Sequence, residues 1–331
     1  MKKIALFKRV LAFITVVTGG LLVAGCEPSL AQNEPSIYTA LPVKSDSYYQ
    51  PFSHSLKAFS NQLSRTDRKH VITITNQSMN HRVSRFSYDD IWVRDVAPVI
   101  TTKMVKFKYG SNYLPKADAS YLDRQFRTWL DEEGFNYQVS NLVLDGGNLI
   151  WNGHDTVILT NHVFDDNPGW TRSEIVSELK SKLNVKRVIF IPVEPGDVLG
   201  HADGMVKFIS RNELYVSDFS GNHKLLRKVE HQIKSVIPNA KFVVLPSAYT
   251  SRGQYDRKIA SAKGLYINML ETPTKVYVPQ YGLSMDHKVL KIIRSHTHKK
   301  LIPINVGKIS TMGGSVHCLT WDVPKTMVPE K

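Results

Sequence analysis

One repeated pattern restricts the fold of this chain more than any other feature. An amphipathic segment with helical spacing of apolar residues is followed, about five times, by a short β-branched run. The amphipathic segments are 49–63, 122–133, 172–183, 223–237 and 286–296, and the runs are 71–75, 137–144, 187–193, 241–245 and 301–306. Such units build either a ring of repeats or an open α/β sheet, and the pattern alone does not choose between them.

Local signals support the boundaries of these units. Thr171 and Glu174 form a capping box before the third amphipathic segment. Two strand-like runs, 149–151 and 156–160, flank Asn152-Gly153, a type I′ turn signal. We therefore expect each unit to contain a helix, a strand, a loop and, in several units, a hairpin.

Residues whose side chains could take part in catalysis or binding recur about once in each unit. They are Asp95, Asp145, His201, Asn268 and Cys318, and successive members are 50, 56, 67 and 50 positions apart. In a ring, equivalent loops point at a common centre, so residues distant in sequence would meet there. In an open sheet these loops would be unrelated.

Cys318 is the only cysteine available as a thiol in the folded part. It follows Gly313-Gly314-Ser315-Val316-His317, and the other cysteine, Cys26, closes a lipoprotein signal. No disulfide partner is left for Cys318. A lone thiol behind a Gly-Gly turn in an exported domain is best explained if the thiol does chemistry.

The first 25 residues read as an export signal. Four basic residues precede an apolar run over 10–22, which is shorter than the roughly 20 residues a membrane-spanning helix needs. Val23-Ala24-Gly25-Cys26 resembles the lipobox, in which the cysteine is lipidated, and Glu27 resembles a signal for the outer membrane. We expect 1–25 to be a signal peptide and 26–36 a lipidated tether. Residues 37–331 would then form one catalytic domain facing the periplasm.

The net charge of +14 comes from basic residues spread along the chain. No charge block or nucleic-acid-binding motif is present, so nucleic acid is not an expected partner. The membrane is an expected partner through the lipid anchor at Cys26. The basic surface is expected mainly to favour solubility and sorting, with contact with anionic headgroups as the alternative.

Four motifs occur in the order and at about the spacing of the guanidine-modifying enzymes. They are Trp92-Val93-Arg94-Asp95, Asp145-Gly146-Gly147-Asn148, Gly200-His201-Ala202-Asp203 and the segment ending in Cys318. The chain resembles the agmatine deiminase and bacterial peptidylarginine deiminase branch of that superfamily over about residues 40–325. The resemblance implies the pentein fold, a five-bladed α/β propeller, and a hydrolase that needs no metal and no cofactor.

The resemblance also implies roles for the site residues. Asp95 and Asp203 would grip the planar guanidinium, and Cys318 would attack its carbon as a thiolate. His201 would protonate the departing ammonia and then activate water. Asp145 would orient His201, although relatives often have a glutamate there. The products would be a ureido group and ammonia.

Other residues of the motifs receive weaker expectations. Trp92 could wall the pocket, and Asn148 and Asn268 could hold substrate. Gly146-Gly147 is expected to be a turn with positive φ, and Arg94 to form a structural ion pair. His317 is expected to point away from the nucleophile, because neighbours on a strand face opposite sides.

Several other functions remain open. An amidinotransferase would use the same covalent step with an amine acceptor, and a non-catalytic lipoprotein could bind guanidines without turnover. A cysteine protease or acyltransferase is disfavoured, because its local signatures are absent and two carboxylates oppose thiol ionisation unless a cation lies between them. His201-x-Asp203 as metal ligands lacks further ligands at a recognisable spacing.

The substrate is expected to be a small cationic guanidine or an arginine-containing peptide. Agmatine has a second cation at its far end, which calls for an acidic or aromatic outer pocket. A free peptide carboxylate calls for a basic one, for which Lys106, Lys108 or Lys263 are candidates.

Overall fold

The computed structural model describes residues 34–248 and 253–330. The expected signal peptide, Cys26 and most of the expected tether lie outside these residues. Within the described ranges, no helix is long and apolar enough to cross a membrane.

The described chain is α/β, with short strands gathered into five small sheets. The strands are β1 (Ser36–Ala40), β2 (Val71–Ile74), β3 (Val83–Ser84), β4 (Val99–Ile100), β5 (Met104–Lys108), β6 (Gln138–Val143), β7 (Ile150–Trp151), β8 (Thr156–Thr160), β9 (Arg187–Ile191), β10 (Val206–Ser210), β11 (Glu213–Ser217), β12 (Lys241–Leu245), β13 (Leu270–Glu271), β14 (Lys275–Gln280), β15 (Lys300–Asn305) and β16 (Trp321–Val323). One sheet has the order β16-β1-β2-β3, and the others are β4-β5-β6, β7-β8-β9, β10-β11-β12 and β13-β14-β15.

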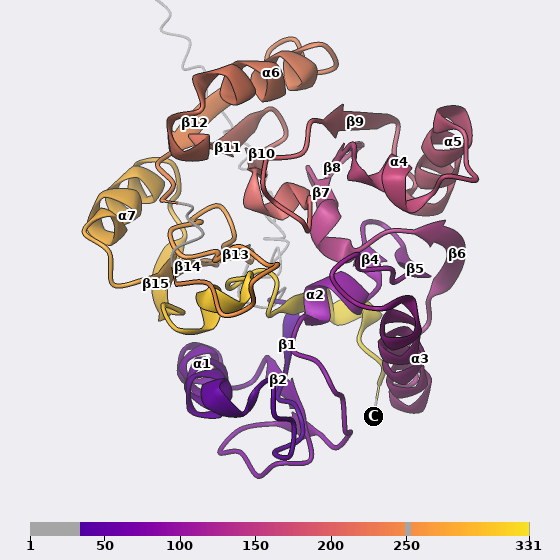
Figure 1. Ribbon diagram of the computed structural model, residues 1–331, viewed down its shortest axis with the longest axis vertical. Helices are drawn as coiled ribbons and strands as arrows, with labels where there is room; N and C mark the ends of the chain where they lie inside the picture. The colour runs from indigo at the N-terminus through magenta and orange to yellow at the C-terminus, as the bar shows by residue number, and fades with distance from the viewer. Residues whose placement is uncertain (1–33, 249–252, 331) are drawn as a thin grey trace, which may run out of the picture.

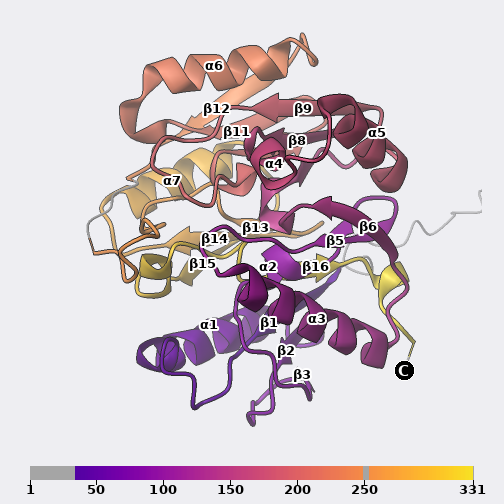
Figure 2. The same cartoon turned by 45° about the vertical axis from the view of Figure 1, so that its right-hand side comes forward.

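The helices connect strands within these sheets, except for α2, which lies between β3 of one sheet and β4 of the next. They are α1 (Ser53–Thr66), α2 (Val93–Val96), α3 (Lys116–Glu133), α4 (His162–Asp166), α5 (Arg172–Leu183), α6 (His223–Lys234) and α7 (Met285–Ser295). Short 3-10 turns are η2 (Gln50–Phe52), η3 (Gly146–Asn148), η4 (Ala202–Gly204), η5 (Phe219–Gly221), η6 (Ile309–Met312) and η7 (Lys325–Met327). In Figure 1 the five long helices lie at the rim, whereas α2 lies near the centre. Figure 2 shows the same helices outside the sheets.

Each sheet follows one connection rule. Two antiparallel strands form a hairpin, and a helix then leads to a third strand parallel to the second, as in β10-β11-α6-β12. A parallel pair needs such a crossover, whereas an antiparallel pair is joined by a short turn. The first sheet differs because its antiparallel partner comes from the other end of the chain: β16 pairs with β1, Tyr38 opposite Trp321.

The repeat predicted from the sequence is confirmed at the level of elements. The helix at 172–183 has the predicted bounds, and its capping box is formed by Thr171 and Glu174. The hairpin at β7-β8 differs in its turn. Asn152 accepts hydrogen bonds from the backbone of residues 154–156, so the loop is longer than a two-residue type I′ turn.

The folded part begins earlier than expected, which corrects the boundary of the tether. Ser36 is already the first residue of β1, and Glu34 is buried. The carboxylate of Glu34 accepts a hydrogen bond from Thr274 N at 2.8 Å and lies 3.3 Å from Lys275 Nζ. Burial would raise the pKa of Glu34, but these contacts lower it. These long-range partners give residues 34–36 a fixed place that their polar sequence did not indicate.

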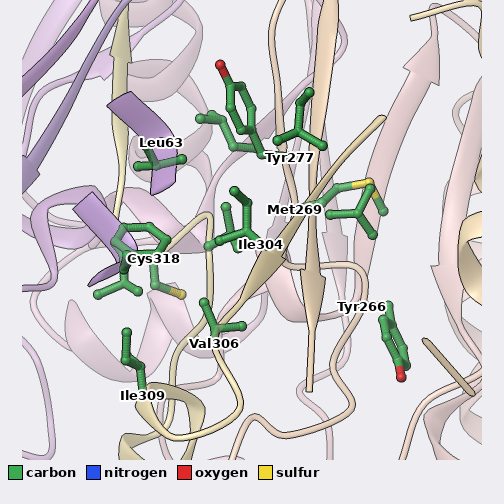
Figure 3. Close-up of a cluster of buried hydrophobic side chains, with 14 of the residues drawn as sticks. Leu63, Tyr266, Met269, Tyr277, Ile304, Val306, Ile309 and Cys318 are labelled. Atoms are coloured by element: carbon green, nitrogen blue, oxygen red, sulfur yellow. The ribbon is translucent and has the colours of Figure 1, made fainter. Parts of the chain in front are cut away.

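Apolar side chains fill the space between the sheets and their helices. The largest cluster joins α1 and α7 to β14 and β15, and it reaches the C-terminal segment at Val316 and Cys318. Figure 3 draws Cys318 together with other members of this cluster, among them Leu63, Val306 and Ile309. The expected nucleophile is therefore part of the packed interior.

Candidate active site

The five recurring residues occupy the same place in their units. Each lies a few residues before the first strand of an antiparallel pair. Asp95 lies within α2 before β4, Asp145 before η3 and β7, His201 before η4 and β10, and Asn268 before β13. Cys318 lies before β16, which pairs with β1. All five are buried. The shared position explains how residues more than 200 positions apart come together.

Asn268 holds the loop that carries the thiol. Its Oδ1 accepts hydrogen bonds from the backbone N–H of His317 at 3.1 Å and of Cys318 at 3.3 Å. Its Nδ2 lies 3.1 Å from Cys318 Sγ. Both polar atoms of this amide contact the loop, so Asn268 positions the thiol. Asn268 also lines one of the two cavities described below, so its contact with substrate stays a prediction.

Burial keeps the Cys318 thiol protonated. The side chain is 5% exposed, packs in the apolar cluster and lies 3.5 Å from Asp203 Oδ2. Burial, followed by the negative charges of Asp203 and Asp95, raises the pKa of the thiol well above its ordinary value. A cation placed between these groups would favour the thiolate.

His201 lies between two carboxylates. Its Nε2 is 3.4 Å from Asp145 Oδ2, and its Nδ1 is 3.5 Å from Asp95 Oδ1. Burial alone would lower the pKa of His201, but Asp95, Asp145 and Asp203 together raise it to about 10. The imidazole is thus protonated at neutral pH, as a general acid must be. Asp145 lies where the resemblance implied.

The two carboxylates of the expected clamp have different surroundings. Asp203 Oδ2 lies 2.7 Å from His317 Nδ1. Burial would raise the pKa of Asp203, but this hydrogen bond and the nearby positive charges lower it. Asp95 accepts only the N–H of Gly147, at 3.2 Å, besides facing His201. Burial, opposed by His201 and reinforced by Asp145 and Asp203, raises the pKa of Asp95 to about 8.

Gly147 marks the centre of the site. A Cβ atom there would lie 2.5 Å from Asp95 Oδ1, 2.8 Å from His201 Nδ1 and 3.3 Å from Asp203 Oδ2. The three functional groups therefore surround one point. The expected positive φ is wrong for Gly146 and Gly147. Both positions instead require glycine because there is no space for a side chain. A Cβ atom at Gly146 would lie 2.2 Å from the carbonyl oxygen of Arg94.

Two adjoining cavities open onto these groups. The first is lined by Trp92, Asp95, Tyr113, Leu199, Ile259, Met312, Gly313, Gly314 and Cys318. The second is lined by Glu194, Asp197, Leu199, His201, Asp203, Gly204, Ile259, Ala260, Leu265, Asn268, Gly313 and Cys318. Trp92 thus forms part of the wall, as expected, and a side chain at Gly314 would meet its ring at 2.3 Å.

Three further expectations are corrected by the structure. Asn148 does not line either cavity, because its Oδ1 accepts from the backbone and the hydroxyl of Thr160 on β8. His317 contacts Asp203, because residues 316–319 form a turn in which strand alternation does not apply. Lys106 is buried in an ion pair with Asp123, so it cannot serve an outer pocket. Arg94 forms the expected structural pair, 2.6 Å from Asp322.

Sequence reasoning missed three residues that line the cavities. Glu194 and Asp197 lie in the loop that leads from β9 to His201, and Tyr113 lies between β5 and α3. Their position in the loops that carry the other site residues was the available signal. In the described part of the chain, no group of three or more His, Cys, Asp or Glu side chains is arranged to hold a metal ion.

Known proteins match this chain over nearly their whole length. A relative from Enterococcus faecalis that carries the provisional name agmatine deiminase is 24% identical, covering 90% of this chain and 95% of its own. The solved agmatine deiminase of Enterococcus faecalis has a TM-score of 0.72 at 20% identity, with 89% and 94% of the two chains covered. A C. jejuni agmatine deiminase with a cysteine-to-serine substitution and bound substrate has a TM-score of 0.69 at 17% identity, with 88% and 94% covered.

The fold and the site define the class of protein as a hydrolase of carbon–nitrogen bonds, a deiminase. The model of the Porphyromonas-type peptidyl-arginine deiminase family matches residues 31–324. The chain belongs to this family.

Proposed function

We propose that the protein hydrolyses a small guanidine to a ureido product and ammonia through a covalent intermediate on Cys318. The observation that carries the proposal is the convergence of an imidazolium and two carboxylates around Gly147, with the buried thiol of Cys318 3.5 Å from one of those carboxylates, Asp203. A guanidinium is planar and donates pairs of parallel N–H bonds, so it fits between two carboxylates.

Binding of the cation prepares the thiol. The positive guanidinium between Asp95 and Asp203 offsets the charges that keep the pKa of Cys318 high, and the thiol loses its proton to solvent. The thiolate attacks the guanidinium carbon, and protonated His201 gives its proton to the nitrogen that leaves as ammonia. An S-alkylthiouronium then remains on Cys318.

Hydrolysis completes the cycle. Neutral His201, held by Asp145 at 3.4 Å, removes a proton from water, and the resulting hydroxide attacks the thiouronium carbon. The carbon–sulfur bond breaks, the thiolate of Cys318 is regenerated, and the ureido product departs. An amine in place of water would make the same protein an amidinotransferase.

Acidic residues in the second cavity support a substrate with a cation at its far end. Glu194 and Asp197 line it, and no lysine or arginine of the described residues lines either site cavity. Burial, with Asp197 nearby, raises the pKa of Glu194 to about 7, and burial also raises the pKa of Asp197. A second cation would be stabilised as both carboxyls ionise. Agmatine has this chemistry, whereas a peptide with a free carboxylate does not.

The experiment compares agmatine with N-butylguanidine, which lacks only the distal amine, and with peptides that contain or end in arginine. We expect ammonia and ureido product with the highest kcat/KM for agmatine. Glu194→Gln and Asp197→Asn should reduce kcat/KM for agmatine by about tenfold each and leave N-butylguanidine nearly unchanged. Faster turnover of a peptide would reject this substrate class, product only with an added amine would indicate transfer, and binding without product would indicate a binding protein.

The proposal includes a ring of five units, the pentein propeller, as the frame of the site. Its support is the common connection rule of the five sheets, the pairing of β16 with β1 and the radial placement of the long helices (Figure 1). A ring places the loops before the hairpins at one centre.

The proposal also includes export and anchoring at the outer membrane, facing the periplasm. Its support is the sequence of residues 1–36 alone: a basic start, a short apolar run and the lipobox at Cys26. Membrane fractionation of the wild type and of Cys26→Ser tests the anchor, because the variant should leave the membrane pellet.

A further inference from the structure

A third cavity, of about 360 Å³, lies behind the nucleophile loop. It is bordered by strand residues of all five sheets, from β4, β7, β10, β13 and β16, and it shares no lining residue with the two site cavities. His317 separates them: it lines this cavity, while its Nδ1 contacts Asp203 on the site side. The deimination chemistry makes no use of this space.

Charged side chains gather around this cavity, and positive charge is in excess. Arg94 lies 2.6 Å from Asp322, and Lys299 lies 2.7 Å from Glu271. The third cation, Lys207 on β10, makes no hydrogen bond and no ion pair within 4 Å among the described residues. The carboxylates that act on its charge, Glu271 and Asp322, are already paired with Lys299 and Arg94. Two lining carboxylates thus face three lining cations.

A second donor near Lys207 also lacks an acceptor. Trp151 lines the same cavity, and its Nε1 is buried with no hydrogen-bond partner in the described structure. A buried donor without an acceptor destabilises a fold, so such donors normally bind water, an ion or a ligand. Burial lowers the pKa of Lys207, which is consistent with a cation whose counter-charge is incomplete.

We propose that this cavity binds a small oxyanion, such as phosphate or a dicarboxylate. Lys207 supplies the unpaired positive charge, Trp151 supplies a neutral N–H donor, and Arg94 and Lys299 keep the surrounding potential positive although each is already paired.

The oxyanion would also contact the back of the active site. Arg94 lines the cavity, its backbone N–H donates to the carbonyl oxygen of Cys318 at 3.2 Å, and its Nε donates to that of His317 at 3.5 Å. An occupied cavity therefore supports the loop that carries the thiol. Binding itself does not depend on turnover, so it is measured separately from the proposed reaction.

The experiment is titration calorimetry of the purified protein with sodium phosphate and with sodium succinate, up to on the order of 10 mM and at constant ionic strength. We expect saturable binding of at least one of them at one site. Lys207→Met should weaken it by about tenfold or more, because it removes the unpaired cation. Lys228→Met, at an exposed position on α6, is the matched control and should bind like the wild type.

A second variant keeps the test decisive if Lys207→Met folds poorly. Glu271→Gln removes a carboxylate from the cavity wall and frees Lys299, so it should bind the oxyanion several-fold more tightly. Damage to the fold would weaken binding instead. No saturable binding of either anion by the wild type, unchanged affinity in Lys207→Met, or weaker binding by a folded Glu271→Gln would overturn the proposal.

Discussion

The two sides of the guanidinium site contain the same kind of group in different states. On one side, Asp203 is bonded to His317 and keeps a lowered pKa. On the other, Asp95 accepts one backbone N–H, lies near the carboxylate of Asp145 and has a pKa raised to about 8. Both are aspartates in a short loop before a hairpin, and their sequence context does not distinguish them.

The two carboxylates of the proposed guanidinium clamp, Asp95 and Asp203, therefore differ in protonation in the free protein. Asp203 is ionised in the free protein, whereas Asp95 is protonated near neutral pH. Asp95 ionises when the pH rises or when a cation binds beside it. In the free site, the three aspartates around the His201 imidazole are therefore not all negatively charged. Substrate binding on the Asp95 side includes the free energy of ionising that group.

Removal of the nucleophile should have the largest effect. We expect Cys318→Ala to lower kcat by on the order of 10⁴-fold or more while the fold is retained, because no other group can form the covalent intermediate. Release of ureido product measures the loss, and circular dichroism checks the fold. A variant that keeps a tenth of the wild-type rate would show that Cys318 is not the nucleophile. Because Cys318→Ala should not turn over substrate, it can be used to measure the guanidine Kd when Asp95 or Asp203 is also substituted.

The comparison of the two carboxylates predicts unequal losses. At pH 7, Asp203→Asn should reduce kcat/KM by about 10³-fold and Asp95→Asn by about 10²-fold or less, because only Asp203 is fully ionised in the free protein. Steady-state kinetics with one guanidine measures both.

The pH profile sharpens the same comparison. In the wild type, kcat/KM should rise with pH through about 8 as Asp95 loses its proton and fall above about 10 as His201 loses the proton that it donates. Asp95→Asn should lack the rise near pH 8, and Asp203→Asn should keep it. Equal losses, or a rise that persists in Asp95→Asn, would contradict the asymmetry.

The contact of His317 with Asp203 should have the smallest effect. His317→Phe removes the N–H that lowers the pKa of Asp203, so kcat/KM should fall by about tenfold at pH 6 and recover as pH rises. His317→Gln retains a donor and is the matched control. The pH dependence separates this positioning role from a loss of packing, which would lower activity equally at all pH values.

Much of the architecture could be predicted because its signals are local. Apolar periodicity and the capping box place the helix at 172–183, and the recurring special residues fall before hairpins as their spacing indicated. The neighbours of these residues could not be predicted in the same way. His317 contacts Asp203 because its segment turns, and Asn148 bonds Thr160 instead of facing the cavity.

Residues whose environment is set by distant partners were the hardest to predict. Glu34 lies in a polar stretch typical of a tether, but it is buried against Thr274 and Lys275, about 240 positions away. Lys106 reads as a surface cation, but Asp123 on α3 holds it in the interior. Periodicity and motif spacing contain no information on such pairs, because each depends on how separate units pack.

The pairing of β16 with β1 ties the position of Cys318 to contact between the two ends of the fold. Cys318 lies three residues before β16, and β16 finds its place only against a strand formed almost 300 residues earlier. Contacts between such distant segments form late, because closing a long loop is entropically costly. The sulfur of Cys318 is therefore held by two sets of long-range contacts, those of β16 with β1 and those of Asn268 with the thiol loop.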